Sequence, residues 1–127
     1  MLKTGILNPQ INSLLSRVRH TNTLVIADRG FPFWPTIETV DISLLDDIPT
    51  VLDVLHAVAA NFNIGNAWMA SEFRDRISAT RLNAYTSLLP VIQFEPHSEF
   101  KHRVPFAIGL IRTADTIPFS NIILESA

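Results

Sequence analysis

Apolar and polar residues recur along the chain with two different periods, and these periods predict helices and strands in turn. The segment 8–19 carries apolar residues at helical spacing, with Asn8 as its N-cap. The next apolar run, 23–27 (TLVIA), is short, continuous and rich in β-branched residues, which is typical of a strand covered on both faces. His20 precedes this predicted strand and Asp28 follows it.

The same alternation continues to the end of the chain. Apolar stripes predict helices over 50–62 and 78–89, and one or two helical turns over 96–103. Strands are predicted over 37–42, 66–73, 91–95, 105–112 and 121–126. This order predicts a single α/β domain over residues 1–127, in which helices flank a largely parallel or mixed sheet.

Composition adds an expectation of self-association. A chain of 127 residues has the size of one domain, and 47% apolar residues against 17% charged is generous for a monomer of that size. We therefore expect buried contacts between subunits. The chain has no cysteine, and its apolar runs are far shorter than the roughly 20 residues of a membrane helix, so we expect a soluble, cytoplasmic protein.

Charge and spacing argue against several classes of ligand. A net charge of −2 without a basic patch disfavours nucleic acid. The four glycines are too scattered for a nucleotide-binding loop, and the four histidines lack the spacing of a metal site. We therefore predict no metal and no nucleotide cofactor, and a small neutral molecule as the ligand.

His20 and Asp28 leave two interpretations open. Each is explained as an ordinary end residue, with His20 in solvent after a helix and Asp28 terminating a strand. Alternatively both belong to a ligand site, because ligands of open α/β sheets bind beyond the carboxyl ends of the strands. Since the predicted strand spans most of a sheet's height, the two side chains would then meet only between neighbouring chains.

Three segments together resemble the D-ribose pyranase / L-fucose mutarotase family. They read RHTNTLVIADRGFP (19–32), FEPHSEFK (94–101) and PFSNIIL (118–124), and the likeness runs in the same order over essentially the whole chain. The resemblance implies small α/β subunits in homo-oligomeric rings of about eight to ten copies, with sites where subunits meet. It also implies conversion between ring forms or anomers of a monosaccharide, without metal or nucleotide.

The resemblance assigns roles to individual residues. The family's catalytic histidine matches His20, and its substrate-binding aspartate matches Asp28. The histidine typical of ribose pyranases matches His97, which favours a ribose-like sugar. The implied substrate-binding residues are Asp28, His97, Phe119, Ser120 and Asn121.

The assigned chemistry is reasonable for these residue types. Opening a cyclic hemiacetal removes a proton from the anomeric hydroxyl and delivers one to the ring oxygen, and an imidazole of pKa about 6.5 performs either transfer near neutral pH. The ionised Asp28 and the amide of Asn121 suit the hydroxyl groups of a sugar.

Three residues depart from the family pattern. Phe119 lacks the hydroxyl of the family's tyrosine, which leaves open mutarotation of L-fucose or another aldose, or a carbohydrate-binding subunit without catalysis. Arg19 and Arg29 replace smaller residues beside His20 and Asp28. Both arginines are compatible with an anionic group on the substrate and equally with solvent exposure.

Overall fold

A six-stranded sheet forms the centre of the computed structural model, which describes residues 1–127, and its strand order is β2-β5-β1-β6-β3-β4. The strands are β1 (Thr23–Ala27), β2 (Glu38–Asp41), β3 (Ile64–Ala70), β4 (Gln93–Glu95), β5 (Gly109–Arg112) and β6 (Ile122–Ser126). β1 and β2 pair in parallel with β5, and β3 with β4, whereas β6 is antiparallel to both β1 and β3. The prediction of a largely parallel sheet is confirmed, with β6 as the one reversed strand.

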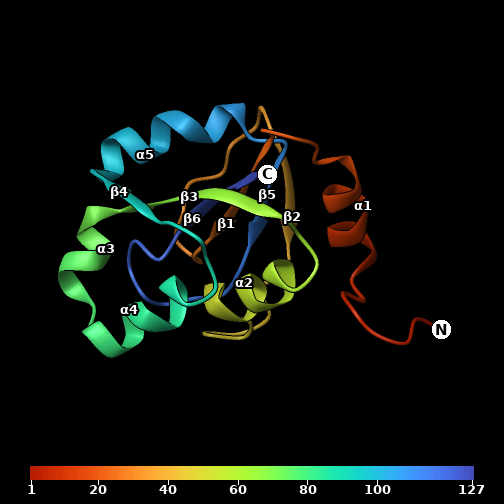
Figure 1. Ribbon diagram of the computed structural model, residues 1–127, viewed down its shortest axis with the longest axis horizontal. Coiled ribbons are helices and arrows are strands. Elements are labelled where there is room, and N and C mark those ends of the chain that lie inside the picture. Colours follow the sequence, from red (N-terminus) through yellow and green to blue (C-terminus); the bar gives the residue numbers. More distant parts are fainter.

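Helices cover both faces of this sheet. They are α1 (Pro9–Arg17), α2 (Val51–Ala59), α3 (Ser71–Arg76), α4 (Ala79–Thr86), α5 (His97–Arg103) and the short 3₁₀ helix η1 (Val104–Phe106). Alternate residues of β1 point to opposite faces, so that Leu24 and Ile26 join the core with α1, α2, α3 and α4, while Val25 and Ala27 join the core with α5. Figure 1 shows α5 on one side of the sheet and α2 and α4 on the other.

Local signals explain where the first two helices begin. The Asn8 side chain accepts a hydrogen bond from the Ile11 N–H at 3.0 Å, as its predicted N-cap role requires. Thr50 and Asp53 form a capping box at the start of α2. Both helices are confirmed, but α2 ends at Ala59, three residues before the predicted end, and α4 likewise ends at Thr86 rather than at residue 89.

Two predicted strands extend too far. The strand predicted over 66–73 begins at Ile64 and ends at Ala70, after which the chain turns directly into α3. Ala70 offers no side-chain cap, so the usual signal for a helix start is missing. The strand predicted over 105–112 begins only at Gly109, because Pro105 lies in η1 and the Ala107 N–H donates to the Val104 carbonyl.

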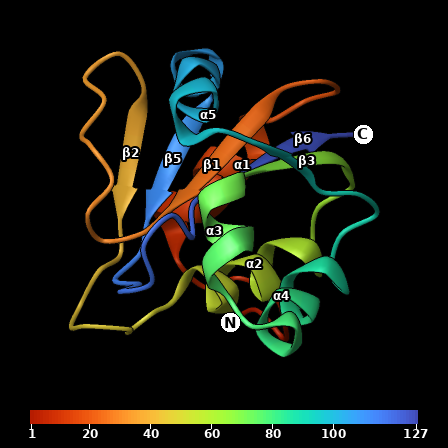
Figure 2. The same ribbon diagram turned by 90° about the vertical axis from the view of Figure 1, so that its left-hand side faces the viewer.

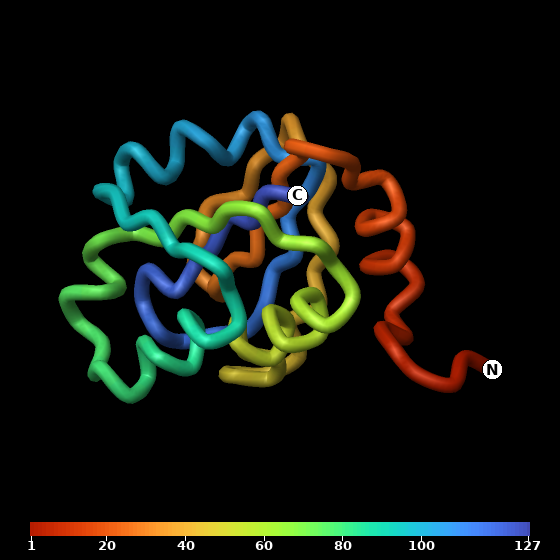
Figure 3. Tube along the Cα trace, in the orientation of Figure 1, coloured from red at the N-terminus to blue at the C-terminus, as the bar shows by residue number.

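The strand directions decide which loops lie together. β1, β3, β4 and β5 all end at one edge of the sheet, and the reversed β6 begins there. Figure 2 shows the arrows of β1, β2 and β5 pointing in the same direction. The segment before α1 extends away from the domain (Figure 3). None of the helices is long and apolar enough to cross a membrane.

Candidate functional site

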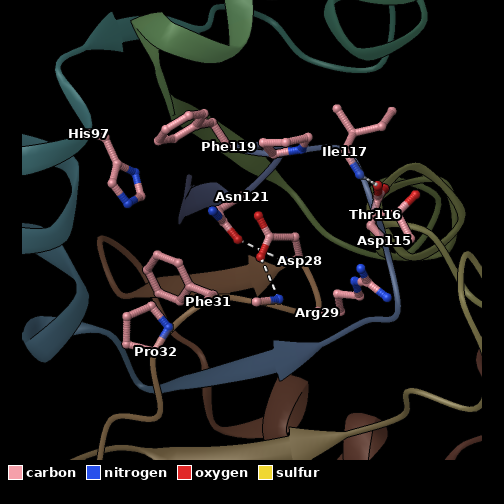
Figure 4. A pocket seen from close by; sticks show the side chains of 12 residues that line it. Asp28, Arg29, Phe31, Pro32, His97, Asp115, Thr116, Ile117, Phe119 and Asn121 are labelled. Atoms are coloured by element: carbon pink, nitrogen blue, oxygen red, sulfur yellow. Dashed lines mark hydrogen bonds between the residues drawn. The ribbon is translucent and has the colours of Figure 1, made fainter.

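A pocket of about 290 Å³ lies at the edge of the sheet where these strands end. Its lining comes from the loop after β1, the connection from β5 to β6 and the start of α5 (Figure 4). The lining residues are Asp28, Arg29, Gly30, Phe31, Pro32, His97, Asp115, Thr116, Ile117, Pro118, Phe119 and Asn121. The structure thus brings together Asp28, His97, Phe119 and Asn121, four of the residues that the sequence singled out.

Asp28 is the first residue after β1 and is only 8% exposed. Its backbone N–H donates to Oδ1 of Asn121 at 2.6 Å, and its own Oδ1 accepts the Gly30 N–H at 3.0 Å (Figure 4). Burial raises the pKa of Asp28 above its ordinary value, and hydrogen bonds from Gly30, Phe31 and Asn121 oppose this rise. The carboxylate is therefore held in a fixed orientation at the floor of the pocket.

Asn121 and Ser120 directly precede β6 but have different surroundings. The Asn121 amide is 2% exposed and joins the start of β6 to the end of β1 through its bond to Asp28. Ser120 is fully buried, its hydroxyl has no hydrogen-bond partner, and it does not line the pocket. Asn121 therefore lines the pocket, whereas Ser120 lies behind its wall.

His97 begins α5 and lies among three aromatic rings. Its ring centre is 6.0 Å from that of Phe31, 5.9 Å from Phe100 and 5.0 Å from Phe119. Burial and the neighbouring Lys101 lower the pKa of His97, so the imidazole is neutral at neutral pH. Its Nδ1 is buried without a hydrogen-bond partner, and the residue itself lines the pocket.

Phe119 occupies a strained backbone position on the pocket wall. Its φ of +62° lies in the left-handed region, which is uncommon for a residue with a bulky side chain. The rings of Phe119 and His97 pack edge to face. The guanidinium of Arg76 lies 4.9 Å from the Phe119 ring centre. The ring is thus fixed between a histidine and a cation, but it presents no hydroxyl group to the pocket.

Arg112 holds the loop after β1 in place. Its guanidinium donates to the carbonyl oxygen atoms of Asp28 at 3.2 Å, Arg29 at 3.4 Å and Pro32 at 3.2 Å. Because one planar group binds three carbonyls of the same loop, it fixes the backbone that carries the pocket residues.

Asp115 is a pocket residue that the sequence analysis missed. Its carboxylate accepts the N–H groups of Val51 at 2.9 Å and Ile117 at 2.8 Å, so it ties the β5–β6 connection to the start of α2. The position carried a usable signal, because Asp115 comes soon after β5, at the same edge of the sheet as Asp28.

His20 lies outside this pocket, before β1 and therefore at the opposite edge of the sheet. β1 alone separates the two edges by roughly 16 Å. His20 is exposed, and its imidazole makes no hydrogen bond or ion pair. The next residue, Thr21, has φ +66°, and its N–H donates to the Ser126 carbonyl at 3.0 Å. One chain alone therefore does not bring His20 to Asp28.

The two arginines that depart from the family pattern contact other parts of the chain. Arg29 is on the pocket rim and forms an exposed ion pair with Asp46 at 2.6 Å. Arg19, the residue before His20, donates a hydrogen bond from its guanidinium to the backbone carbonyl of Ser16. No three His, Asp or Glu side chains in the molecule are grouped closely enough to hold a metal ion.

Known proteins are similar to this chain over nearly its whole length. The D-ribose pyranase of Geobacillus kaustophilus is 39% identical over 99% of this chain and 93% of its own length, and that of Laribacter hongkongensis is 36% identical over 99% and 97%. The structure described as Bacillus subtilis RbsD complexed with D-ribose covers 100% of this chain and 98% of its own, with a TM-score of 0.88 and 30% identity.

More distant structures share the fold. The fucose mutarotase of Streptococcus pneumoniae, solved with L-fucose, superposes with a TM-score of 0.78 at 15% identity, over 99% of this chain and 98% of its own. The profile of the RbsD / FucU transport protein family matches residues 1–127. This chain therefore belongs to the RbsD/FucU family.

Proposed function

We propose that this protein is a sugar isomerase that converts D-ribose between its pyranose and furanose forms. The observation that carries the proposal is the convergence of Asp28, His97 and Asn121 on one small pocket. Full-length relatives named D-ribose pyranase, and a similar structure described with D-ribose, support ribose as the sugar.

Each pocket residue has a role in this proposal. The ionised Asp28 accepts hydrogen bonds from sugar hydroxyls, and charge-assisted bonds of this kind are the stronger ones. The neutral imidazole of His97 lines the same pocket and exchanges one further hydrogen bond with the sugar. The aromatic rings of Phe31 and Phe119 supply the apolar faces that pack against the C–H groups of the sugar ring.

Proton transfer is assigned to His20 of a neighbouring copy of this chain. A base takes the proton from the anomeric hydroxyl while the bond between C1 and the ring oxygen breaks and that oxygen gains a proton, which gives the open-chain aldehyde. Attack of the 4-hydroxyl on C1, with loss of its proton and protonation of the carbonyl oxygen, then closes the furanose. One imidazole serves as base and then as acid, since histidine side chains in general exchange protons near neutral pH.

A homo-oligomer follows from this assignment. Since His20 lies at the opposite edge of the sheet from the pocket, a second copy must supply it. We extend the proposal to a ring of about eight to ten subunits, as the family resemblance implies, acting in the cytoplasm. Light scattering that finds a monomer at micromolar concentration would contradict this part of the proposal.

Saturation-transfer NMR on D-ribose tests the activity directly. The protein should accelerate exchange between the pyranose and furanose signals without added metal or nucleotide. L-fucose, tested in parallel, distinguishes a ribose enzyme from a fucose mutarotase. If neither sugar nor any other common aldose exchanges faster with protein than without it, the proposed activity is wrong.

Phe119 favours a second candidate, a carbohydrate-binding subunit without catalysis, because its ring presents no hydroxyl to the pocket. If the protein only binds sugar, calorimetry will detect ribose binding and NMR will find no accelerated exchange. The substitution Phe119→Tyr separates the two candidates. A binding-only protein should gain exchange activity from the restored hydroxyl, whereas an active pyranase should already exchange ribose with phenylalanine in place.

A further inference from the structure

The start of α5 depends on a side chain from another helix. α5 begins with His97, and the preceding Pro96 supplies no side-chain cap. The N–H groups in the first turn of a helix have no partner within the helix and need one from elsewhere. Both carboxylate oxygens of Glu72, on α3, accept the His97 N–H, each at 3.1 Å. Glu72 thus acts as the missing cap for α5.

This contact fixes the backbone of the residue that carries the pocket imidazole. Phe100, one helical turn later, is fully buried, and its ring stacks on the His97 ring with an angle of 14° between the planes. Glu72 therefore holds the backbone of His97 while Phe100 supports its ring. Neither Glu72 nor Phe100 lines the pocket.

The charge of Glu72 also acts on the imidazole. Burial alone would raise the pKa of Glu72, but hydrogen bonds from backbone N–H groups, including that of His97, and from the Ser71 hydroxyl lower it, so the carboxylate stays ionised at neutral pH. Three charged groups face His97. Lys101 lowers its pKa, and Glu72 and Asp28 raise it. Glu72 thus partly offsets the effect of burial on His97.

We propose that Glu72 is a positioning residue for His97, which it serves by capping α5 at the edge of the sugar pocket. The inference rests on the proposed function, because the contact between Glu72 and His97 affects affinity only if the pocket binds a sugar. It concerns a residue that touches no substrate and acts only through the histidine. The hydrogen bonds between Glu72 and His97 link α3 to α5 beyond the carboxyl ends of β3 and β4, which pair in parallel.

Two substitutions separate the cap from the charge. Glu72→Gln keeps an oxygen acceptor for the His97 N–H but removes the charge, whereas Glu72→Ala removes both. We expect Glu72→Ala to weaken D-ribose binding, measured by calorimetry, by roughly tenfold, because the pocket residue His97 is then less firmly preorganised. Glu72→Gln should recover most of that affinity.

The imidazole titration, followed by NMR, gives a readout that a purely structural role would not change. In Glu72→Gln the pKa of His97 should fall below that of the wild type, because a negative charge that favours the imidazolium has been removed. Glu99→Gln is the matched control. Glu99 is an exposed carboxylate on α5 that pairs with His102, and its substitution should change neither the His97 titration nor the affinity.

The outcomes distinguish the inference from the proposed function. Wild-type affinity in Glu72→Ala, or an unchanged His97 titration in Glu72→Gln, would overturn the positioning role. If the alanine variant does not fold by circular dichroism, the glutamine variant decides the question alone. A wild-type protein that binds no ribose would refute the proposed function, while the titration of His97 in Glu72→Gln would still test its coupling to Glu72.

Discussion

The two ends of β1 differ sharply in what surrounds them. At the carboxyl end, Asp28 is 8% exposed and hydrogen-bonded to the start of β6, and its loop is bound by Arg112. At the amino end, His20 is exposed and its imidazole makes no hydrogen bond or ion pair. Only its backbone is constrained, by the left-handed Thr21 that follows it.

This difference matches the two proposed roles, sugar binding at the pocket end and proton transfer at the His20 end. The pocket end is organised within one chain, as the proposed sugar-binding role requires. The histidine end has a fixed backbone and a free imidazole, which suits a group that acts on a molecule held by another copy. Strain of this kind costs of order 1–3 kcal/mol and persists where the surrounding structure enforces it.

Replacing His20 should have the largest effect on activity. In His20→Ala we expect the rate of ribose exchange to fall roughly 10²–10⁴-fold, the usual contribution of a positioned acid–base group. The melting temperature should hardly change, because the side chain is exposed and makes no hydrogen bond. NMR exchange and thermal melting measure the two effects.

His56→Ala is the matched control, because His56 is also exposed but lies on α2. It should retain wild-type exchange. Full activity in His20→Ala would remove the catalytic role of His20 and with it the need for a neighbouring copy.

Replacing Asp28 should lower affinity while it raises stability. Asp28→Asn removes the charge that accepts the sugar hydroxyls, so calorimetry should find ribose binding weaker by roughly tenfold to a hundredfold. The same change removes a buried charge and keeps an oxygen for the Gly30 N–H, so the melting temperature at neutral pH should rise.

The pH dependence checks the sign of this effect. Because the pKa of Asp28 is raised in the folded protein above its ordinary value of 3.8, the folded state holds this proton more tightly than the unfolded chain. Its contribution to stability is therefore present below pH 3.8 and is lost as the pH rises through the folded pKa. The advantage of Asp28→Asn should vanish in acid. An advantage that is equal at all pH values would show that the charge is not its cause.

Replacing Thr21 should have the smallest effect. Glycine adopts a positive φ without strain, so Thr21→Gly should gain up to about 1 kcal/mol, since relief of strain outweighs the entropy cost of glycine. That gain corresponds to a rise of roughly 4 °C in melting temperature. Exchange should slow by severalfold, because the backbone beside His20 is less constrained.

Thr4→Gly is the control for Thr21, because Thr4 is exposed and has no positive φ. It should not raise the melting temperature. A Thr21→Gly protein that is less stable than the wild type would mean that the turn is not strained.

Much of the fold could be predicted from local patterns. The cap at Asn8, the capping box at Thr50 and the buried run 23–27 each act within a few residues, and the structure contains all three elements. The errors occurred where no local signal exists. Ala70 has no capping side chain, so the helix that carries Glu72 was predicted as the end of a strand.

The candidate site shows the same division. Asp28 was predictable because it follows a buried strand, and Asp115 could have been found by the same rule. Only the family resemblance predicted His97, Phe119 and Asn121 as site residues, since nothing in their spacing places them together. The contact of Glu72 with His97 joins residues 25 positions apart, and no periodicity indicates it.

The sequence by itself determined most of the elements, their order and the residue types that suit sugar chemistry, because capping and hydrophobic periodicity act over short distances. The tertiary structure decided which of these residues share a pocket. β6 runs antiparallel to its neighbours, so its first residues lie beside the last residues of β1 and β3 at one edge of the sheet. His20 lies at the other edge because it precedes β1, and the two ends of a strand lie at opposite edges of the sheet.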